Sequence, residues 1–260
     1  MKSILTFFLL LSLAVSSMAK SIDTIRITPE NIDIKALQTG SYCYILYNKQ
    51  TKESPAQRIT LVKINVEPQL YHNKPAFVIT QEWDRDTIIH SAYAVFDAKD
   101  FSSILHDTYW KALGYAMKFD FEAKKVDFTD KGIKGGIPDS IKSSAIKDFN
   151  QSFQKYNLNW HADLLIYQLL PYKDNRTFVI NYYDPGFGKA EDVMYTVTGS
   201  DILTDEDGKK IDCWVLNYSD GPKGYERFWI SKKTKEVLKE EDFGTRGYRY
   251  KIKLGVSGDK

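Results

Sequence analysis

Alternating apolar and polar positions run through most of the chain and predict β-strands. Arg58–Val66 alternates between two faces of a strand: one has Ile59, Leu61, Lys63 and Asn65, and the other has Thr60, Val62, Ile64 and Val66. The first half of the chain has strand patterns at Tyr42–Asn48, Arg58–Val66, Ala76–Glu82, Thr87–Phe96, Tyr115–Phe121 and Lys124–Phe128. The second half has them at Asp192–Leu203, Lys210–Tyr218, Tyr225–Ser231, Glu236–Glu241 and Arg246–Leu254.

Short turn-forming segments separate these strands, for example Asp205–Gly208 and Ser219–Pro222. A connection this short fits a hairpin, so we expect antiparallel pairing. Asp205–Gly208 does not fit a calcium loop. With Gly208 at the sixth position of such a loop, Leu203 and Trp214 would occupy the first and twelfth positions, where carboxylates are needed.

Helical spacing replaces the alternation between the glycine-containing segment 132–138 and Pro171. One stripe is formed by Ile146, Phe149, Phe153 and Tyr156. A second helix is expected over Trp160–Leu170, with Asn159 as its N-cap, and it is apolar around much of its circumference. We therefore predict a mainly β (α+β) fold: a large curved antiparallel sheet, or open half-barrel, with one or two covering helices.

The first 19 residues have the three parts of a secretory signal peptide. Lys2 precedes an apolar run, and small residues precede a cleavage site that we predict between Ala19 and Lys20. The apolar run is too short for a membrane-spanning helix, which needs about 20 residues. We expect a soluble periplasmic or secreted protein. Residues 20–260 should form a single domain, because the break at 132–138 is short for a linker.

Charge and composition narrow the class of partner. The chain has 36 basic and 34 acidic residues, and this balance gives no reason to expect a nucleic-acid partner. Aromatic residues make up 14 % of the chain, which suits strands with half-exposed faces. The alternative is a sugar-stacking surface that uses aromatic residues such as Trp83, Tyr109, Trp110 and Tyr183.

The sequence contains no catalytic, metal-binding or cofactor signature, so we expect no enzyme activity and no cofactor. Its four histidines are scattered, without the spacing of zinc ligands, and are expected to be ordinary surface or core residues: His72, His90, His106 and His161. The acidic run Glu240–Asp242 is expected to be solvated, because adjacent strand residues point to opposite faces.

The last third of the chain contains several short strand-and-turn motifs. They are Leu169-Leu170-Pro171, Val197-Thr198-Gly199, Cys213-Trp214-Val215-Leu216, and Phe228-Trp229-Ile230-Ser231 continuing through Thr234, Val237 and Leu238. Their order resembles DUF3108, an exported bacterial family of unknown function. The similarity is clear over about Trp160–Leu254 and only topological over the N-terminal half. It implies the open half-barrel of LolA- and LolB-type periplasmic lipoprotein carriers, which hold acyl chains between a curved sheet and helical lids.

Three hypotheses about function follow. In the first, an exported non-catalytic protein binds a lipid, an acyl chain or another apolar ligand in its half-barrel. In the second, the core is solid and the protein has a structural or envelope-assembly role through a protein partner. In the third, the protein is a secreted glycan-binding module or hydrolase.

The strand Lys210–Tyr218 is apolar on both faces, so each face has to be covered or to line a ligand space. If the second helix stands off from the sheet, the pocket beneath it is expected to be lined by Trp214, Leu216, Trp229, Leu165 and Leu169. If it packs fully onto the sheet, no pocket remains.

The cysteines Cys43 and Cys213 each lie in a predicted strand. They form either a disulfide that closes a long loop or two small buried apolar side chains.

Overall fold

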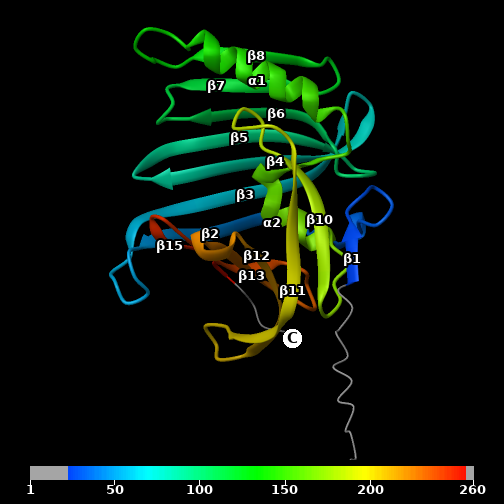
Figure 1. The fold of residues 1–260 in the computed structure, drawn as a ribbon, viewed down its shortest axis with the longest axis vertical. Coiled ribbons are helices and arrows are strands. Elements are labelled where there is room, and N and C mark those ends of the chain that lie inside the picture. The colour runs from blue at the N-terminus through cyan, green and yellow to red at the C-terminus, as the bar shows by residue number, and fades with distance from the viewer. Residues whose placement is uncertain (1–22, 256–260) are drawn as a thin grey trace, which may run out of the picture.

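Fifteen strands make one hydrogen-bonded sheet in the computed structural model, which describes residues 23–255 (Figure 1). The strands are β1 (Asp23–Arg26), β2 (Gly40–Lys49), β3 (Gln57–Tyr71), β4 (Lys74–Arg85), β5 (Thr87–Asp97), β6 (Ser103–Trp110), β7 (Tyr115–Asp120), β8 (Lys125–Asp130), β9 (Leu158–Asn159), β10 (Arg176–Tyr183), β11 (Glu191–Thr204), β12 (Lys210–Ser219), β13 (Tyr225–Ser231), β14 (Val237–Gly244) and β15 (Gly247–Lys253).

Across the sheet the strands follow the order β1-β10-β11-β12-β13-β14-β15-β2-β3-β4-β5-β6-β7-β8, and β9 pairs with β10. Neighbours are antiparallel except at β1–β10 and β9–β10, which are parallel. The last strand, β15, pairs with β2 and so joins the C-terminal strands to the N-terminal ones. The predicted large, curved and open antiparallel sheet is confirmed (Figure 1).

The helical segments are short and lie mostly between β8 and β10. They are the α-helices α1 (Asp139–Ser152) and α2 (Asp163–Ile166) and the 3₁₀ turns η1 (Ile34–Ala36), η2 (Trp160–Ala162), η3 (Tyr167–Leu169) and η4 (Gly221–Lys223). Figure 1 shows α1 lying across β7 and β8, and α2 in front of β3 and β4. We call the sheet face that carries α2 the inner face and the opposite one the outer face.

Register shifts contribute to the curvature of the sheet. A bulge adds a residue to one strand, which bends that strand and increases its twist. Shifts occur in five strand pairs, among them β11–β12 between Val197 and Gly199. Gly199 has a φ of +150°, a conformation that glycine adopts without strain. The segment Val197-Thr198-Gly199 therefore produces a bend in β11.

The inner face is covered by the segment from η2 to η3. Leu165, Leu169 and Tyr167 are fully or almost fully buried there against residues such as Val62 and Leu216. Each buried leucine contributes roughly 1.5–3 kcal/mol relative to an exposed one. A smaller second core lies under α1, where Phe149 packs against Phe119 and Phe121.

The helical segments differ from the expected ones. The first helix ends at Ser152 and buries Ala145 and Phe149, whereas Ile146 of the predicted stripe is exposed. The second is three short turns rather than one helix over Trp160–Leu170. Its predicted cap is present, since the Asn159 side chain accepts a hydrogen bond from the His161 backbone N–H. Packing on the inner face, rather than helix propensity, holds these turns in place.

No strand range was predicted for β1, β6, β9 or β10. β6 contains Ser103, His106, Asp107 and Thr108, whose polar side chains hide the strand pattern. The predicted hairpin Tyr115–Phe121/Lys124–Phe128 is confirmed as β7–β8. The predicted signal peptide and cleavage site lie outside the described residues. No helix within residues 23–255 is long and apolar enough to cross a membrane.

The pairing of β15 with β2 gives a test of the single-domain prediction. A fragment of residues 138–260 lacks β2 to β8, so β15 loses its partner and the turns η2 to η3 lose the apolar surface of β3. We expect this fragment to show no cooperative urea transition by tryptophan fluorescence, whereas residues 20–260 show one. A sigmoidal transition of the fragment would establish two independent domains.

Candidate functional site

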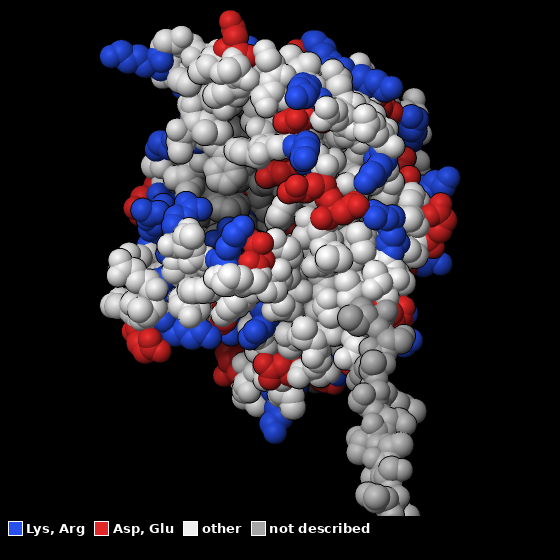
Figure 2. Space-filling model, viewed as in Figure 1, with Lys and Arg blue, Asp and Glu red and all other residues white. Residues whose placement is uncertain are grey.

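A groove of about 230 Å³ opens on the inner face beside the helical turns. It is lined from β4, β6, β15, the η2–α2 segment and the β10–β11 loop, by Gln81, Trp83, His106, Thr108, Trp110, Trp160, His161, Asp163, Asp184, Phe187, Arg249 and Lys251. Figure 2 shows a hollow on this side of the molecule, over the region where Figure 1 places β4 to β6.

Aromatic side chains form one wall of the groove. The ring centroids of Trp83 and Trp110 are 5.3 Å apart in an edge-to-face arrangement. Trp110 also stacks on His90, at 3.7 Å, and meets the ring of Phe187 edge-on at 6.2 Å. Phe187 is 51 % exposed, which is high for a large apolar side chain that lines a groove. Such a wall offers flat apolar surface to a ligand.

Three histidines that are far apart in sequence meet beside this wall, and two of them, His106 and His161, line the groove. Nε2 of His90 and Nε2 of His161 are 3.0 Å apart, and the rings of His106 and His161 are 5.2 Å apart. Burial lowers the pKa of His90 to about 4 and that of His106 to about 3. Burial, with the two neighbouring imidazoles, holds the pKa of His161 well below its usual value. All three are therefore neutral at pH 7.

The hydrogen bonds assign the ring protons. Nδ1 of His90 lies 2.9 Å from the Tyr109 carbonyl oxygen, which only accepts, so this nitrogen carries the proton. Nε2 of His90 then accepts from Nε2–H of His161, which leaves Nδ1 of His161 as an acceptor. Asn159 donates to Nδ1 of His106 across 3.1 Å. The cluster is thus a fixed hydrogen-bonded unit.

Arg249 and Lys251, which line the groove, belong to an ion network whose centre, Glu240, is buried. Glu240 is 1 % exposed and lies 2.6 Å from Nζ of Lys251 and 2.8 Å from the guanidinium of Arg249. Arg249 also lies 3.0 Å from Asp242. Burial alone would raise the pKa of Glu240, but Lys251 and Arg249 hold it below its usual value. The two cations that line the groove are therefore already engaged by carboxylates.

Two carboxyl groups that line the groove, unlike that of Glu240, have raised pKa values. Burial raises the pKa of Asp184 to about 7, and the charge of Asp163 adds to this effect. Burial also raises the pKa of Asp163, against the opposing charge of Lys251. The inner face thus carries more carboxyl groups than its cations neutralise.

Three polar atoms of the lining residues have no hydrogen-bond partner among the described residues: the hydroxyl of Thr108, the indole N–H of Trp110 and Nε–H of Arg249. Thr108 is only 2 % exposed, so its hydroxyl gains little from bulk solvent. A buried polar group without a partner is costly and is usually satisfied by water or a ligand.

The structure brings together only part of the pocket expected from the sequence. Leu165, Leu169 and Leu216 meet in the main core, and Trp214 packs at its margin. Trp229 lies on the outer face, with Ile211 and Cys213, because it stands opposite Val215 in the β12–β13 register. Trp214 and Trp229 therefore cannot line one cavity.

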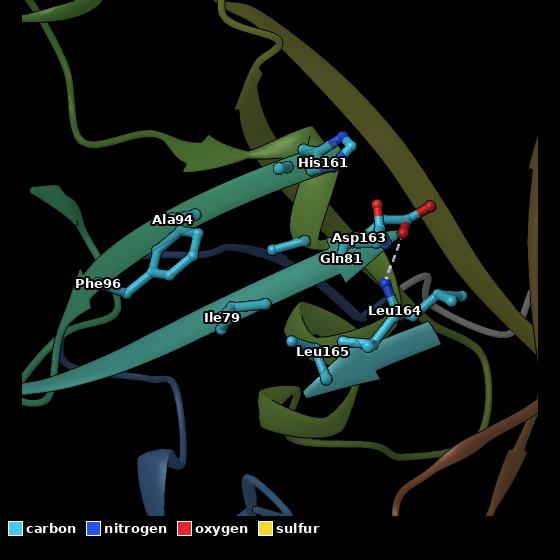
Figure 3. A pocket seen from close by; sticks show the side chains of 11 residues that line it. Ile79, Gln81, Ala94, Phe96, His161, Asp163, Leu164 and Leu165 are labelled. Carbon is cyan, nitrogen blue, oxygen red and sulfur yellow. Dashed lines mark hydrogen bonds between the residues drawn. The ribbon is translucent and has the colours of Figure 1, made fainter. Parts of the chain in front are cut away.

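Little space remains beneath the helical turns. The cavity between α2 and strands β3 to β5 has a volume of about 10 Å³ (Figure 3). Its lining includes Ile79, Phe96 and Leu165. This volume corresponds to about one water molecule. An acyl chain would need the helical turns to move away from the sheet.

Cys43 and Cys213 are free thiols. They lie on β2 and β12, which β13, β14 and β15 separate in the sheet. Four strand spacings amount to roughly 19 Å along the sheet, whereas a disulfide needs Cα atoms within about 7 Å. Of the two alternatives, the structure has the small buried thiol at Cys213, while Cys43 is half-buried.

The acidic run Glu240–Asp242 is not solvated as expected. Its residues do alternate between faces, but Glu240 and Glu241 are both buried. Glu241 accepts a hydrogen bond from the Tyr225 hydroxyl at 2.6 Å, with Lys52 3.4 Å away. Partners from β13 and the β2–β3 turn could not be identified from local sequence.

The histidine cluster was also missed. Had β6 been recognised, the β5–β6 register would have placed His106 opposite Ala94 and Trp110 opposite His90 on one face. His161 joins them only through the tertiary fold. Among residues 23–255, no group of three or more His, Cys, Asp or Glu side chains is arranged to hold a metal ion. Of the aromatic residues considered for sugar stacking, Trp83 and Trp110 line the groove, whereas Tyr183 is fully buried.

Comparison with known proteins places this curved sheet in a family. The sequence model of "Protein of unknown function (DUF3108)" matches residues 49–253, and the chain belongs to this family. No curated protein matches the chain.

Three solved structures are similar to it. A protein from Parabacteroides distasonis is 9 % identical, with 84 % of this chain and 94 % of that chain covered and a TM-score of 0.33. A β-barrel-like DUF1849 protein from Brucella abortus is 8 % identical, with 85 % and 97 % covered and a TM-score of 0.35. A DUF1329 family protein from Desulfovibrio piger is 11 % identical, with 86 % and 90 % covered and a TM-score of 0.27. The similarity to these three structures supports no statement about a ligand, an activity or a partner of this chain.

The ion network predicts a large effect of one substitution. Lys251→Met leaves Glu240 buried with one cation fewer, and we expect the free energy of unfolding to fall by about 3 kcal/mol. Adding Glu240→Gln should recover more than half of that loss. Urea unfolding at pH 7 measures both. As a control, Lys63→Met breaks the exposed pair with Asp84 and should cost less than about 1 kcal/mol. Equal losses for the two lysine variants would contradict a buried network.

The histidines predict a loss of stability in acid. Because the folded pKa of His90 lies near 4 and its unfolded value near 6.5, its contribution is complete above about pH 6.5 and is lost as the pH falls toward 4. In His90→Gln, the slope of unfolding free energy against pH in this window should decrease by up to about 1.4 kcal/mol per pH unit. Urea unfolding between pH 4 and 7 tests this, and parallel curves for the two proteins would contradict it.

Proposed function

We propose that this protein is an exported, non-catalytic binding protein that holds a small amphipathic ligand in the groove on the inner face of its half-barrel. The observation that carries the proposal is the pairing of an aromatic wall with a buried, unpaired Thr108 hydroxyl in one open groove. The wall suits an apolar ring or face of the ligand, and the lining suits its polar groups.

The core itself supports this location for a ligand. Beneath the helical turns only about 10 Å³ is free, against about 230 Å³ in the groove. Binding in the groove needs no movement of the turns from η2 to η3. The resemblance to LolA- and LolB-type proteins implied a lipid carrier. In this proposal the ligand instead binds in the groove on the inner face of the half-barrel.

A neutral fluorescent probe with an aromatic ring system, N-phenyl-1-naphthylamine, tests the proposal on residues 20–260. We expect saturable binding that Phe187→Ala weakens about five-fold, because this substitution removes one aromatic contact worth about 1 kcal/mol. Phe187 is exposed, so its truncation should leave the melting temperature unchanged. Leu70→Ala, which truncates an apolar side chain 72 % exposed and outside the groove, is the matched control.

The same experiment separates the groove from the core. Leu165→Trp would obstruct the space between α2 and the sheet and should not affect a ligand held at Phe187. If a fluorescent fatty acid binds, and Leu165→Trp weakens its binding while Phe187→Ala does not, the ligand lies in the core and the proposal is wrong. Absence of saturable binding of either probe would leave a structural shell that acts through a protein partner.

A further inference from the structure

The side chains that line the groove indicate which class of ligand it favours, which the shape of the groove alone does not. Its hydrogen-bonding and charged groups can be divided into those already engaged within the protein and those left for a ligand. The second set decides which ligand chemistry is favoured.

The positive charges in the lining are paired with carboxylates, and only Nε–H of Arg249 has no hydrogen-bond partner among the described residues. Lys251 pairs with Glu240 at 2.6 Å, and Arg249 pairs with Glu240 and Asp242 at 2.8 and 3.0 Å. An anionic ligand would have to compete with these buried carboxylates, which sit on the same inner face. The groove is therefore poorly suited to anions.

The groups left over are mostly acceptors. No ion pair or side-chain hydrogen bond to another described residue engages the carboxyl group of Asp184, and Asp163 bonds only the adjacent Leu164 backbone N–H, at 2.6 Å. Nδ1 of His161 is an acceptor by the proton assignment above. Thr108 is 2 % exposed, and its hydroxyl has no hydrogen-bond partner within residues 23–255. Asp163, Asp184 and His161 can accept from a ligand that donates. The Thr108 hydroxyl can accept or donate, and the unpartnered N–H groups of Trp110 and Arg249 donate.

The aromatic wall of the groove also favours a positively charged ligand. The face of an indole ring is electron-rich and attracts a cation within about 6 Å of its centroid, most strongly where water is excluded. Trp83, Trp110 and Trp160 all line the groove, alongside the two aspartates. One face of Trp110 stacks on His90 and one face of Trp160 stacks on Tyr182, which leaves the other faces and the ring of Trp83 for a ligand. Carboxyl groups and indole rings in one groove are complementary to an organic cation.

We infer that the groove selects a ligand bearing a positively charged nitrogen, an amine or a quaternary ammonium group, with Asp184 as its counter-ion and the tryptophans as its walls. This inference rests on the proposed function and specifies the class of ligand. Asp184 is half-buried and burial raises its pKa to about 7, so a bound cation would favour the ionised form of its carboxyl group over the neutral form.

Two probes of the same shape test the inference. Choline carries a quaternary nitrogen, and 3,3-dimethylbutan-1-ol replaces that nitrogen by carbon. Isothermal titration of residues 20–260 should show saturable binding of choline with an affinity at least about ten-fold above that of the neutral alcohol. Asp184→Asn should abolish this preference. Asp212→Asn, which removes a carboxylate on β12 outside the groove, should leave it unchanged.

The outcomes separate the inference from the proposed function. Equal affinities for choline and the alcohol, or no saturable choline binding, overturn the inference while the naphthylamine result still decides whether the groove binds a ligand. A preference that persists in Asp184→Asn overturns the assignment of Asp184. A circular-dichroism melting curve for each variant shows that a lost preference does not reflect unfolding.

Discussion

The structure depends on the pairing of β15 with β2. This antiparallel contact joins the last strand of the chain to one of the first, and it makes two strand meanders into one sheet. Because neighbouring strands twist in one sense and several carry bulges, a sheet of this extent curves and encloses an inner face. The helical turns from η2 to η3 then find apolar surface on both sides, which explains why they need little intrinsic helix propensity.

The same pairing determines the chemistry of the groove. Lys251 and Arg249 stand on the inner face of β15 because β15 is fixed in register between β14 and β2. Glu240 and Asp242 on β14 lie directly opposite them. Buried ion pairs of this kind contribute little net stability compared with apolar packing. Their position beside an open groove, where no ion pair within residues 23–255 engages Asp184, is the setting of the ligand site that we propose.

Much of the fold was predictable because strand alternation is a local property. The β7–β8 hairpin and the two-faced β12 strand follow from residue order alone. β6 was missed because His106 and Thr108 occupy inner-face positions where a strand pattern usually has apolar residues. Trp229 was assigned to the wrong side because its side relative to Trp214 depends on the register between strands, which one strand pattern does not specify.

By itself, the sequence determined the class of fold, the turns between strands and the two apolar faces of β12, since these depend on neighbours a few residues apart. Only the tertiary structure decided which groups meet in the groove. His90 and His161 are 71 positions apart, and they touch because β5 and the segment before α2 meet on the inner face. The filled space beneath α2 is likewise a property of the whole core, because packing density depends on side chains from many strands at once.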